Sequence, residues 1–339
     1  MRSYQQWVFN DPCPPHDNKL FKFRQKDILK ETMAGDNWAD LWPSGYQHPI
    51  PAKNMGQGIE SENFKVRIAA HGNIELTGAY YHRGQSPPRN KFVVIVFSGS
   101  GGPANHFIKG IVSGYLKPEF ARFIHGVIIF DYRGFGLSKD PSKSIRQYEP
   151  TGFYLPTSRG LYTDATAITR YATQALGLSP NQLILHGYSM GSGPATHLAA
   201  RDFSSDIAGL VLHGPMESLM YNAKQSLTEE RGSLIGYIGG KVADLNAGFR
   251  NIDKLKTVHA PICICCGPND KEMWPQAMHI IKKAKSLKKA GFLAVHDGSH
   301  DDTAAPFRPP RPQKKTNPPA NSPIQLLRFL RFISQQQFG

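Results

Sequence analysis

The sequence has 339 residues but only four cysteines, and it has no apolar run long enough to cross a membrane. Three cysteines (Cys263, Cys265 and Cys266) fall in one strand-like segment. This clustering excludes a disulfide framework, and the cysteines lack the spacing of a zinc site. Alternation along that strand predicts Cys263 and Cys265 on one face of a sheet and Cys266 on the other. The longest apolar runs fall far short of the roughly 20 residues that a membrane-spanning helix needs. The first twenty residues lack the apolar core of a signal peptide. We therefore expect a protein that is not transmembrane, and that is cytoplasmic or exported without a conventional signal peptide.

Acidic residues are scarce relative to basic ones. The chain has 40 Lys and Arg against 26 Asp and Glu, a formal net charge of +14. A basic surface favours nucleic acid, anionic lipid or acidic substrates as partners. Because no nucleic-acid-binding motif accompanies the charge, we expect no nucleic acid, and an anionic membrane surface stays a candidate partner. The basic residues gather at 282–289 and at 306–323. The second segment contains seven prolines and no acidic residue, which predicts a mobile loop.

The order of apolar segments predicts the fold class. Residues 1–60 show no regular periodicity, and their aromatic residues predict an irregular lead-in packed on the core. From 61 to 339, apolar strands alternate with helical segments, which predicts one α/β domain with a mostly parallel central sheet and helices on both faces. The predicted strands are 64–70, 74–81, 92–97, 127–130, 183–185, 207–212, 262–266 and 292–295, with a closing helix at 324–334. Residues 215–257 have no strand signal and are predicted to form a short lid after the sixth strand.

One motif points to chemistry. The run Gly187-Tyr188-Ser189-Met190-Gly191 matches G-x-S-x-G, with a short buried strand before it and a helix of small residues after it. In that context the serine occupies a sharp strand-to-helix turn, and the glycines allow neighbouring chain to approach. A serine hydroxyl is a weak nucleophile alone and needs a base that an acid holds in place. We therefore predict that Ser189 is a catalytic nucleophile.

Partners for Ser189 are expected after later strands, in the order serine, acid, histidine. Asp270 follows the strand 262–266, and His300 follows the strand 292–295, so both lie beyond carboxyl ends of strands. His296 competes with His300 for the role of base, and Glu217 competes with Asp270 for the role of acid. We favour Asp270 and His300 because both lie on loops beyond their strands.

An oxyanion formed by serine attack needs two N–H donors. The N–H of Met190 is one by construction of the turn. The second is expected from the loop 98–102, at Ser100, with Gly101 as the alternative. We also predict that Gly101 and Tyr188 contact the substrate. The chemistry needs no metal and no cofactor.

These motifs together resemble the α/β-hydrolase superfamily. The segments FSGSGG, DYRGFGLS, GYSMG, GPND and GSHDD occur in the family's order, and the resemblance covers about 62–300 and the last helix. The nearest likeness is to single-domain serine hydrolases of the abhydrolase-domain kind, with a short lid. The resemblance implies an α/β-hydrolase fold with Ser189 as nucleophile, Asp270 as acid and His300 as base. It also implies scaffold roles for Asp131 and Arg133.

The expected function is hydrolysis of a carboxylic ester or thioester through an acyl-enzyme. Apolar residues in the predicted lid favour a fatty-acyl or lipid substrate. The alternatives are a small carboxylesterase or peptidase, and a non-catalytic binding protein on a hydrolase fold. A dinucleotide-binding protein is a further alternative, because residues 99–104 fit G-x-G-x-x-A after a strand. That reading leaves the GYSMG, GPND and GSHDD segments unexplained.

Overall fold

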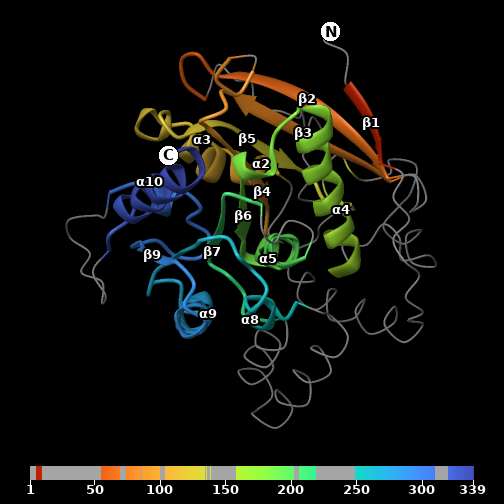
Figure 1. Cartoon of the computed structure of the whole chain (residues 1–339). Helices are drawn as coiled ribbons and strands as arrows, with labels where there is room; N and C mark the ends of the chain where they lie inside the picture. Colours follow the sequence, from red (N-terminus) through yellow and green to blue (C-terminus); the bar gives the residue numbers. More distant parts are fainter. Residues whose placement is uncertain are drawn as a thin grey trace, which may run out of the picture.

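A nine-stranded sheet forms the centre of the molecule (Figure 1). A computed structural model describes residues 5–9, 55–68, 74–84, 86–99, 104–133, 135, 138, 158–201, 206–218, 249–309 and 320–339. The strand order is β1-β2-β3-β5-β4-β6-β7-β8-β9. The strands are β1 (Gln5–Phe9), β2 (Glu60–Ile68), β3 (Ile74–His82), β4 (Phe92–Phe97), β5 (Ile124–Phe130), β6 (Leu183–Tyr188), β7 (Gly209–His213), β8 (Ile262–Cys266) and β9 (Gly291–Val295). From β5 to β9 all neighbours are parallel, whereas β3 is antiparallel to both of its neighbours.

The parallel strands are the most apolar segments of the chain. Every residue of β4, β5, β6, β7 and β8 is buried. Continuous apolar strands of this kind are buried on both faces, and parallel strands need helices to cross back between them. The predicted α/β architecture is therefore confirmed, and the carboxyl ends of β4, β6, β7, β8 and β9 meet at one edge of the sheet.

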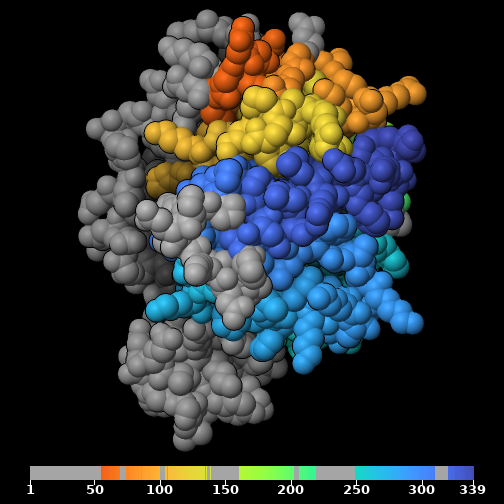
Figure 2. Space-filling model, turned by 90° about the vertical axis from the view of Figure 1, so that its left-hand side faces the viewer, coloured from red at the N-terminus to blue at the C-terminus, as the bar shows by residue number. Residues whose placement is uncertain are grey.

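Helices cover both faces of the sheet. One face packs against α4 (Ser158–Arg170), α5 (Ser192–Ala200) and α9 (Met273–Ser286). The other face packs against α2 (Asn105–Phe107), α3 (Ser113–Tyr115) and α10 (Ile324–Phe338). Figure 2 looks onto the second face, where α10 in dark blue lies between the yellow segment of α2 and α3 and the lighter blue chain of β8 to β9. The alternation of the cysteines is also as predicted, with Cys263 and Cys265 in one core and Cys266 in the other.

The first edge of the sheet differs from the prediction. No strand was expected before residue 60, but β1 pairs in parallel with β2 over five residues, from Gln5↔Phe64 to Phe9↔Ile68. The local sequence Trp-Val-Phe suits a strand, yet five residues without a partner give no detectable period. The antiparallel pair of β2 and β3 is as expected, with Ile68 opposite Ile74. The other residues of the expected lead-in before Met55 lie outside the described residues.

The proline-rich stretch was expected to be a mobile loop without helix or strand, and this is wrong at its start. Ala305–Phe307 forms one 3-10 turn, and Phe307 is only 1% exposed. Its ring packs edge-on against Tyr115 at 4.7 Å and Phe120 at 5.9 Å between centroids. Burial of one large aromatic side chain outweighs the poor helix propensity of the prolines around it. Residues 310–319 lie outside the described residues.

The two ends of the predicted lid are fastened together. The backbone N–H of Asn251 donates to the carbonyl of Glu217 at 3.0 Å, and its side-chain amide donates to the carbonyl of Met216 at 2.9 Å. The same amide reaches Ser192 Oγ at 3.3 Å, on the first turn of α5. Residues 216–217 and Asn251 therefore lie side by side, next to the start of the helix that follows Ser189. Residues 219–248, which make up most of the predicted lid, lie outside the described residues.

In the described part of the chain, no helix has both the length and the apolar character needed to cross a membrane.

Candidate active site

Ser189 lies on the sharp turn between β6 and α5. Its φ is 50°, a left-handed backbone conformation that is strained for a serine. The turn packs tightly because its two flanking glycines have no Cβ. A Cβ on Gly191 would lie 1.9 Å from the carbonyl oxygen of Phe97, and one on Gly187 would lie 2.6 Å from the carbonyl oxygen of Gly191. The G-x-S-x-G spacing thus has a direct steric reason here.

At the carboxyl edge of the sheet His300 contacts the Ser189 hydroxyl, and Asp270 contacts His300. His300 Nε2 lies 3.0 Å from Ser189 Oγ, and His300 Nδ1 lies 2.8 Å from Asp270 Oδ2. Asp270 is itself held, since its Oδ1 accepts the backbone N–H of Met273 at 3.1 Å and its Oδ2 lies 4.0 Å from the Cys266 thiol. With the Nδ1 proton donated to Asp270, Nε2 can accept the proton of the serine hydroxyl. This arrangement can activate the hydroxyl as a nucleophile.

Known proteins share this fold. A family model described as the alpha/beta hydrolase fold matches residues 93–234. The "Multifunctional-autoprocessing repeats-in-toxin" of Vibrio cholerae is 26% identical over 255 residues, which are 71% of this chain and 5% of the toxin. The human "Alpha/beta hydrolase domain-containing protein 17B" is 27% identical over 162 residues, 48% of this chain and 46% of that protein. The chain is similar to these proteins in sequence and has the α/β-hydrolase fold.

Solved structures show the same fold. An esterase of Pyrococcus furiosus superposes with a TM-score of 0.56 at 17% identity, over 88% of this chain and 99% of that one. An alpha-beta hydrolase of Vibrio vulnificus gives a TM-score of 0.53 at 23% identity, over 87% and 94% of the two chains. The chain matches only about 5% of the length of the toxin and under half of the human protein.

The environment of His300 favours the charged form of its ring. Burial lowers the pKa of His300, but the hydrogen bond and the charge of Asp270, with the charges of Glu272 and Asp301, outweigh burial and raise the pKa above its usual value. The side chain is 25% exposed while that of Asp270 is 2% exposed. A base with a raised pKa holds a proton well when it takes one from the serine.

The other histidines near Ser189 behave in the opposite way. His296, the competing candidate for the base, is 3% exposed, and burial lowers its pKa to about 4. Its Nδ1 accepts the N–H of Gly298 at 3.2 Å, while its Nε2 has no hydrogen-bond partner among the described residues. His186 and His213 are also buried, and burial lowers the pKa of His186 to about 3 and that of His213 well below its usual value. The structure therefore places His300, and not His296, against Ser189.

Glu217, the competing candidate for the acid, lies apart from Ser189 in this arrangement. Its Oε2 is 2.8 Å from Nδ1 of His279 on α9, and that ring is 54% exposed. Asp270 is the carboxylate that the fold brings to His300.

Tyr188 and Met190 flank the nucleophile. Tyr188, predicted to contact the substrate, is 4% exposed, and its hydroxyl donates to the backbone carbonyl of His300 at 2.6 Å. Met190 belongs to the 3-10 turn Ser189–Gly191 that leads into α5, so its N–H lies at the amino end of that helix. Its predicted role as an oxyanion donor stays a prediction. Ser100 and Gly101 lie outside the described residues.

The predicted scaffold residues fasten loops at the same edge of the sheet. Asp131 Oδ1 accepts the backbone N–H of Ala104 at 2.7 Å, which ties the chain after β4 to the end of β5. Arg133 forms a buried pair with Asp164, with Nη2 at 2.6 Å and Nε at 2.9 Å from Oδ1. Neither pair touches Ser189 through a hydrogen bond that the structure describes.

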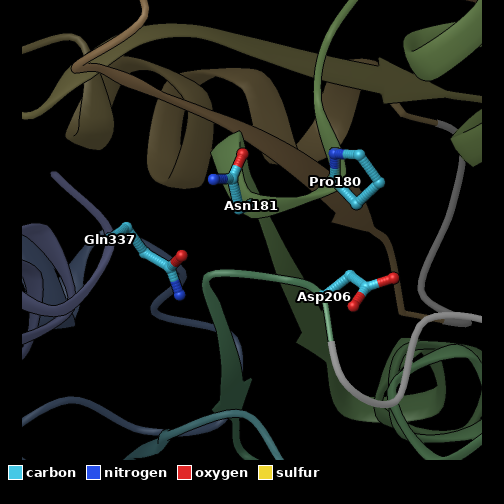
Figure 3. A pocket seen from close by; sticks show the side chains of 4 residues that line it. All are labelled: Pro180, Asn181, Asp206 and Gln337. Carbon is cyan, nitrogen blue, oxygen red and sulfur yellow. The ribbon is translucent and has the colours of Figure 1, made fainter.

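A surface hollow lies at the other edge of the sheet. It is lined by Pro180, Asn181, Asp206 and Gln337 (Figure 3). Pro180 and Asn181 precede β6 and Asp206 precedes β7, so the hollow sits at the amino ends of these two strands, away from Ser189 at the carboxyl end of β6. Within the described ranges, no group of three or more His, Cys, Asp or Glu side chains is arranged to hold a metal ion.

Proposed function

We propose that this chain is a serine hydrolase that cleaves a carboxylic ester or thioester through an acyl-enzyme. The observation that carries the proposal is the line of contacts from Ser189 Oγ through His300 to Asp270, at 3.0 and 2.8 Å, on a strained turn at the carboxyl edge of the sheet. A structural serine needs neither the strain nor a histidine whose other nitrogen is held by a buried carboxylate.

The proposed reaction uses each group in turn. Ser189 Oγ attacks the carbonyl carbon while His300 Nε2 takes the hydroxyl proton, and Asp270 stabilises the imidazolium that forms. The oxyanion accepts hydrogen bonds from the backbone N–H groups of Met190 and Ser100, with Gly101 as the alternative to Ser100. His300 then gives its proton to the leaving oxygen or sulfur. Water, deprotonated by His300, attacks the acyl-enzyme, and His300 returns that proton to Ser189 Oγ as the acid leaves.

The first test is labelling with a fluorophosphonate, which phosphonylates an activated serine. Wild-type protein is expected to be labelled, and Ser189→Ala and His300→Ala are expected to lose the label. His279→Ala is the matched control, because it removes another histidine that lies 2.8 Å from a carboxylate and should leave labelling intact. A folded wild-type protein that takes no label contradicts the proposal and favours a binding protein on a hydrolase fold.

We further propose a fatty-acyl or lipid ester as the substrate, with Gly101 among the residues that contact it. The apolar residues of the segment 219–248 support this, because its two ends are fastened beside Ser189. A series of p-nitrophenyl esters from two to sixteen carbons tests it. Higher kcat/KM for long chains is the expected result. A maximum at acetate instead favours a small carboxylesterase, and cleavage of peptides alone favours a peptidase.

The two basic clusters differ as candidates for membrane contact. The helix α9 returns the chain from β8 to the start of β9, so the lysines at 282–289 lie at the amino edge, away from Ser189. The proline-rich segment starts only six residues after His300. We therefore propose that Arg311, Lys314 and Lys315 meet an anionic bilayer.

Hydrolysis of anionic against zwitterionic liposomes at several salt concentrations tests the proposed membrane contact. Alanine at Arg311, Lys314 and Lys315 should abolish the preference for anionic liposomes, whereas alanine at Lys282 and Lys285 should not. Equal rates on both lipids at every salt concentration contradict the membrane proposal.

A further inference from the structure

Tyr188 connects the strand that carries the nucleophile to the loop that carries the base. It is the last residue of β6 and immediately precedes Ser189. Its hydroxyl donates to the backbone carbonyl of His300 at 2.6 Å, while Ser189 Oγ contacts the ring of the same histidine at 3.0 Å. Two consecutive residues of one rigid turn therefore hold the backbone and the side chain of His300.

The ring of Tyr188 supports the imidazole as well. The two rings stack with centroids 5.3 Å apart and an angle of 19° between their planes. On its other sides the phenol ring contacts Phe107 at 5.3 Å and His213 at 4.9 Å between centroids. His213 is opposite Tyr188 in the β6–β7 register, so this wall is part of the sheet. The phenol is thus a fixed surface against which the base lies.

The hydroxyl remains a donor over the working pH range. Burial raises the pKa of Tyr188 well above its usual value, and the charges of Asp301, Asp270 and Asp302 raise it further. The phenol therefore keeps its proton near neutral pH, and the hydrogen bond to the His300 carbonyl persists where His300 has to act as a base.

We propose that Tyr188 is a positioning residue that holds His300 in place between Ser189 and Asp270, and that it is not a substrate contact. This inference rests on the proposed function. Its physical reason is that a strand end is rigid whereas His300 lies on a loop, and catalysis falls steeply when reacting groups move by about 1 Å. The hydrogen bond and the ring stack transfer the rigidity of β6 to the loop.

The test is Tyr188→Phe, which removes the hydroxyl and keeps the ring. We expect kcat for ester hydrolysis to fall roughly 10- to 100-fold with KM unchanged within about 2-fold. Tyr115→Phe is the matched control. Tyr115 is fully buried, and its hydroxyl contacts His186 Nδ1 at 2.8 Å, so the control loses a buried tyrosine hydrogen bond away from His300. The control should keep its kcat within about 2-fold. Equal losses of kcat in both variants, or no loss in Tyr188→Phe, overturn the inference.

A second readout does not depend on activity. The chemical-shift titration of the His300 ring, identified by its absence in His300→Gln, reports how closely Asp270 holds that ring. In Tyr188→Phe the midpoint should move to lower pH, because a looser ring gains less from the Asp270 carboxylate. In Tyr115→Phe it should not move. If the wild-type protein hydrolyses no ester, the proposed function fails, but an unchanged midpoint in Tyr188→Phe is still what would refute the positioning role.

Discussion

Two histidine–carboxylate pairs in the described part of the chain have the same separation and different surroundings. His300 Nδ1 and Asp270 Oδ2 are 2.8 Å apart, and so are His279 Nδ1 and Glu217 Oε2. The first pair is largely buried, with side chains 25% and 2% exposed, while the second has side chains 54% and 19% exposed. Only the first presents its other ring nitrogen to a serine hydroxyl among the contacts that the structure describes, at 3.0 Å from Ser189 Oγ.

Distance alone therefore does not distinguish the pair proposed as catalytic from the surface pair. An exposed ion pair contributes only about 0–1 kcal/mol, because water solvates both partners and salt screens them. The carboxylate of Asp270, on the loop after β8, is buried, so water screens its interaction with the imidazole only weakly. Its hydrogen bond with the N–H of Met273 holds it in this orientation. The difference comes from the sheet, which places β8 and β9 side by side and thereby fixes the loops that carry Asp270 and His300.

The largest effect expected from this comparison concerns the two carboxylates. Asp270→Asn should lower kcat by about 10⁴-fold, because an amide neither stabilises the imidazolium nor holds the required tautomer. Glu217→Gln, the matched change in the surface pair, should leave kcat within about 2-fold. Steady-state ester hydrolysis measures both. Comparable losses in the two variants would contradict the assignment of the acid.

A smaller effect concerns how the free energy of unfolding depends on pH. In this respect His300 differs from histidines that are buried without a carboxylate partner. Burial lowers the pKa of His186 to about 3 and that of His296 to about 4. Their folded pKa values lie below the unfolded value near 6.5, so the unfolded chain binds more protons once the pH falls below 6.5. The free energy of unfolding should then drop, by about 1 kcal/mol for each ring between pH 7.5 and 5.5.

His300 contributes with the opposite sign. Its folded pKa is raised, so its contribution to stability is complete below the unfolded pKa and is lost as the pH rises through the folded pKa. Urea unfolding at several pH values measures the sum of these contributions. Replacing His186 or His296 by Gln should flatten the loss of stability in acid, whereas His300→Gln should not. A stability that does not change between pH 7.5 and 5.5 would show that the buried rings are not held neutral.

The smallest effect expected concerns the backbone beside the catalytic pair. Gly214 has a φ of 50°, and a Cβ there would lie 3.1 Å from His300 Nδ1 and 3.2 Å from Asp270 Oδ2. Gly214→Ala should lower kcat roughly 10-fold, because the methyl group crowds the pair and the backbone is strained.

Gly177→Ala is the control for Gly214→Ala, since Gly177 has a φ of 67° and open space around its Cβ position. It should lose about 1 kcal/mol of stability and keep its activity. Thermal unfolding and ester hydrolysis measured on both variants separate backbone strain from crowding. If Gly214→Ala behaves like Gly177→Ala in activity, crowding of the catalytic pair is not important.

Much of the sheet could be predicted from local sequence. The apolar runs at 92–97 and 262–266 coincide with β4 and β8, because a strand buried on both faces has to be apolar throughout. β1 could not be predicted in the same way, since its five residues become a strand only by pairing with β2. Phe307 was missed for a similar reason, because its burial depends on Tyr115, which lies 192 positions earlier in the chain.

Part of the candidate site could likewise be predicted from local sequence, and part could not. The strand–serine–helix pattern around Ser189 is local, and the chain order of acid and histidine follows from the strands that precede them. Two candidates for each partner were left open, because Glu217 and Asp270 both follow strands, and so do His296 and His300. Burial and the approach of the loops select Asp270 and His300, and these depend on distant parts of the chain. The catalytic roles themselves stay predictions that the labelling experiment tests.

The sequence by itself determined the α/β class, the strained turn at Ser189 and the carboxyl edge as the place of the site, because these follow from apolar periodicity and from the steric demands of glycine and serine. The tertiary structure alone decided which carboxylate meets which imidazole, and that the phenol of Tyr188 supports His300. Contacts of this kind join residues that lie 30 to 112 positions apart. No local pattern encodes them, because their geometry is set by how β6, β8 and β9 align in the sheet.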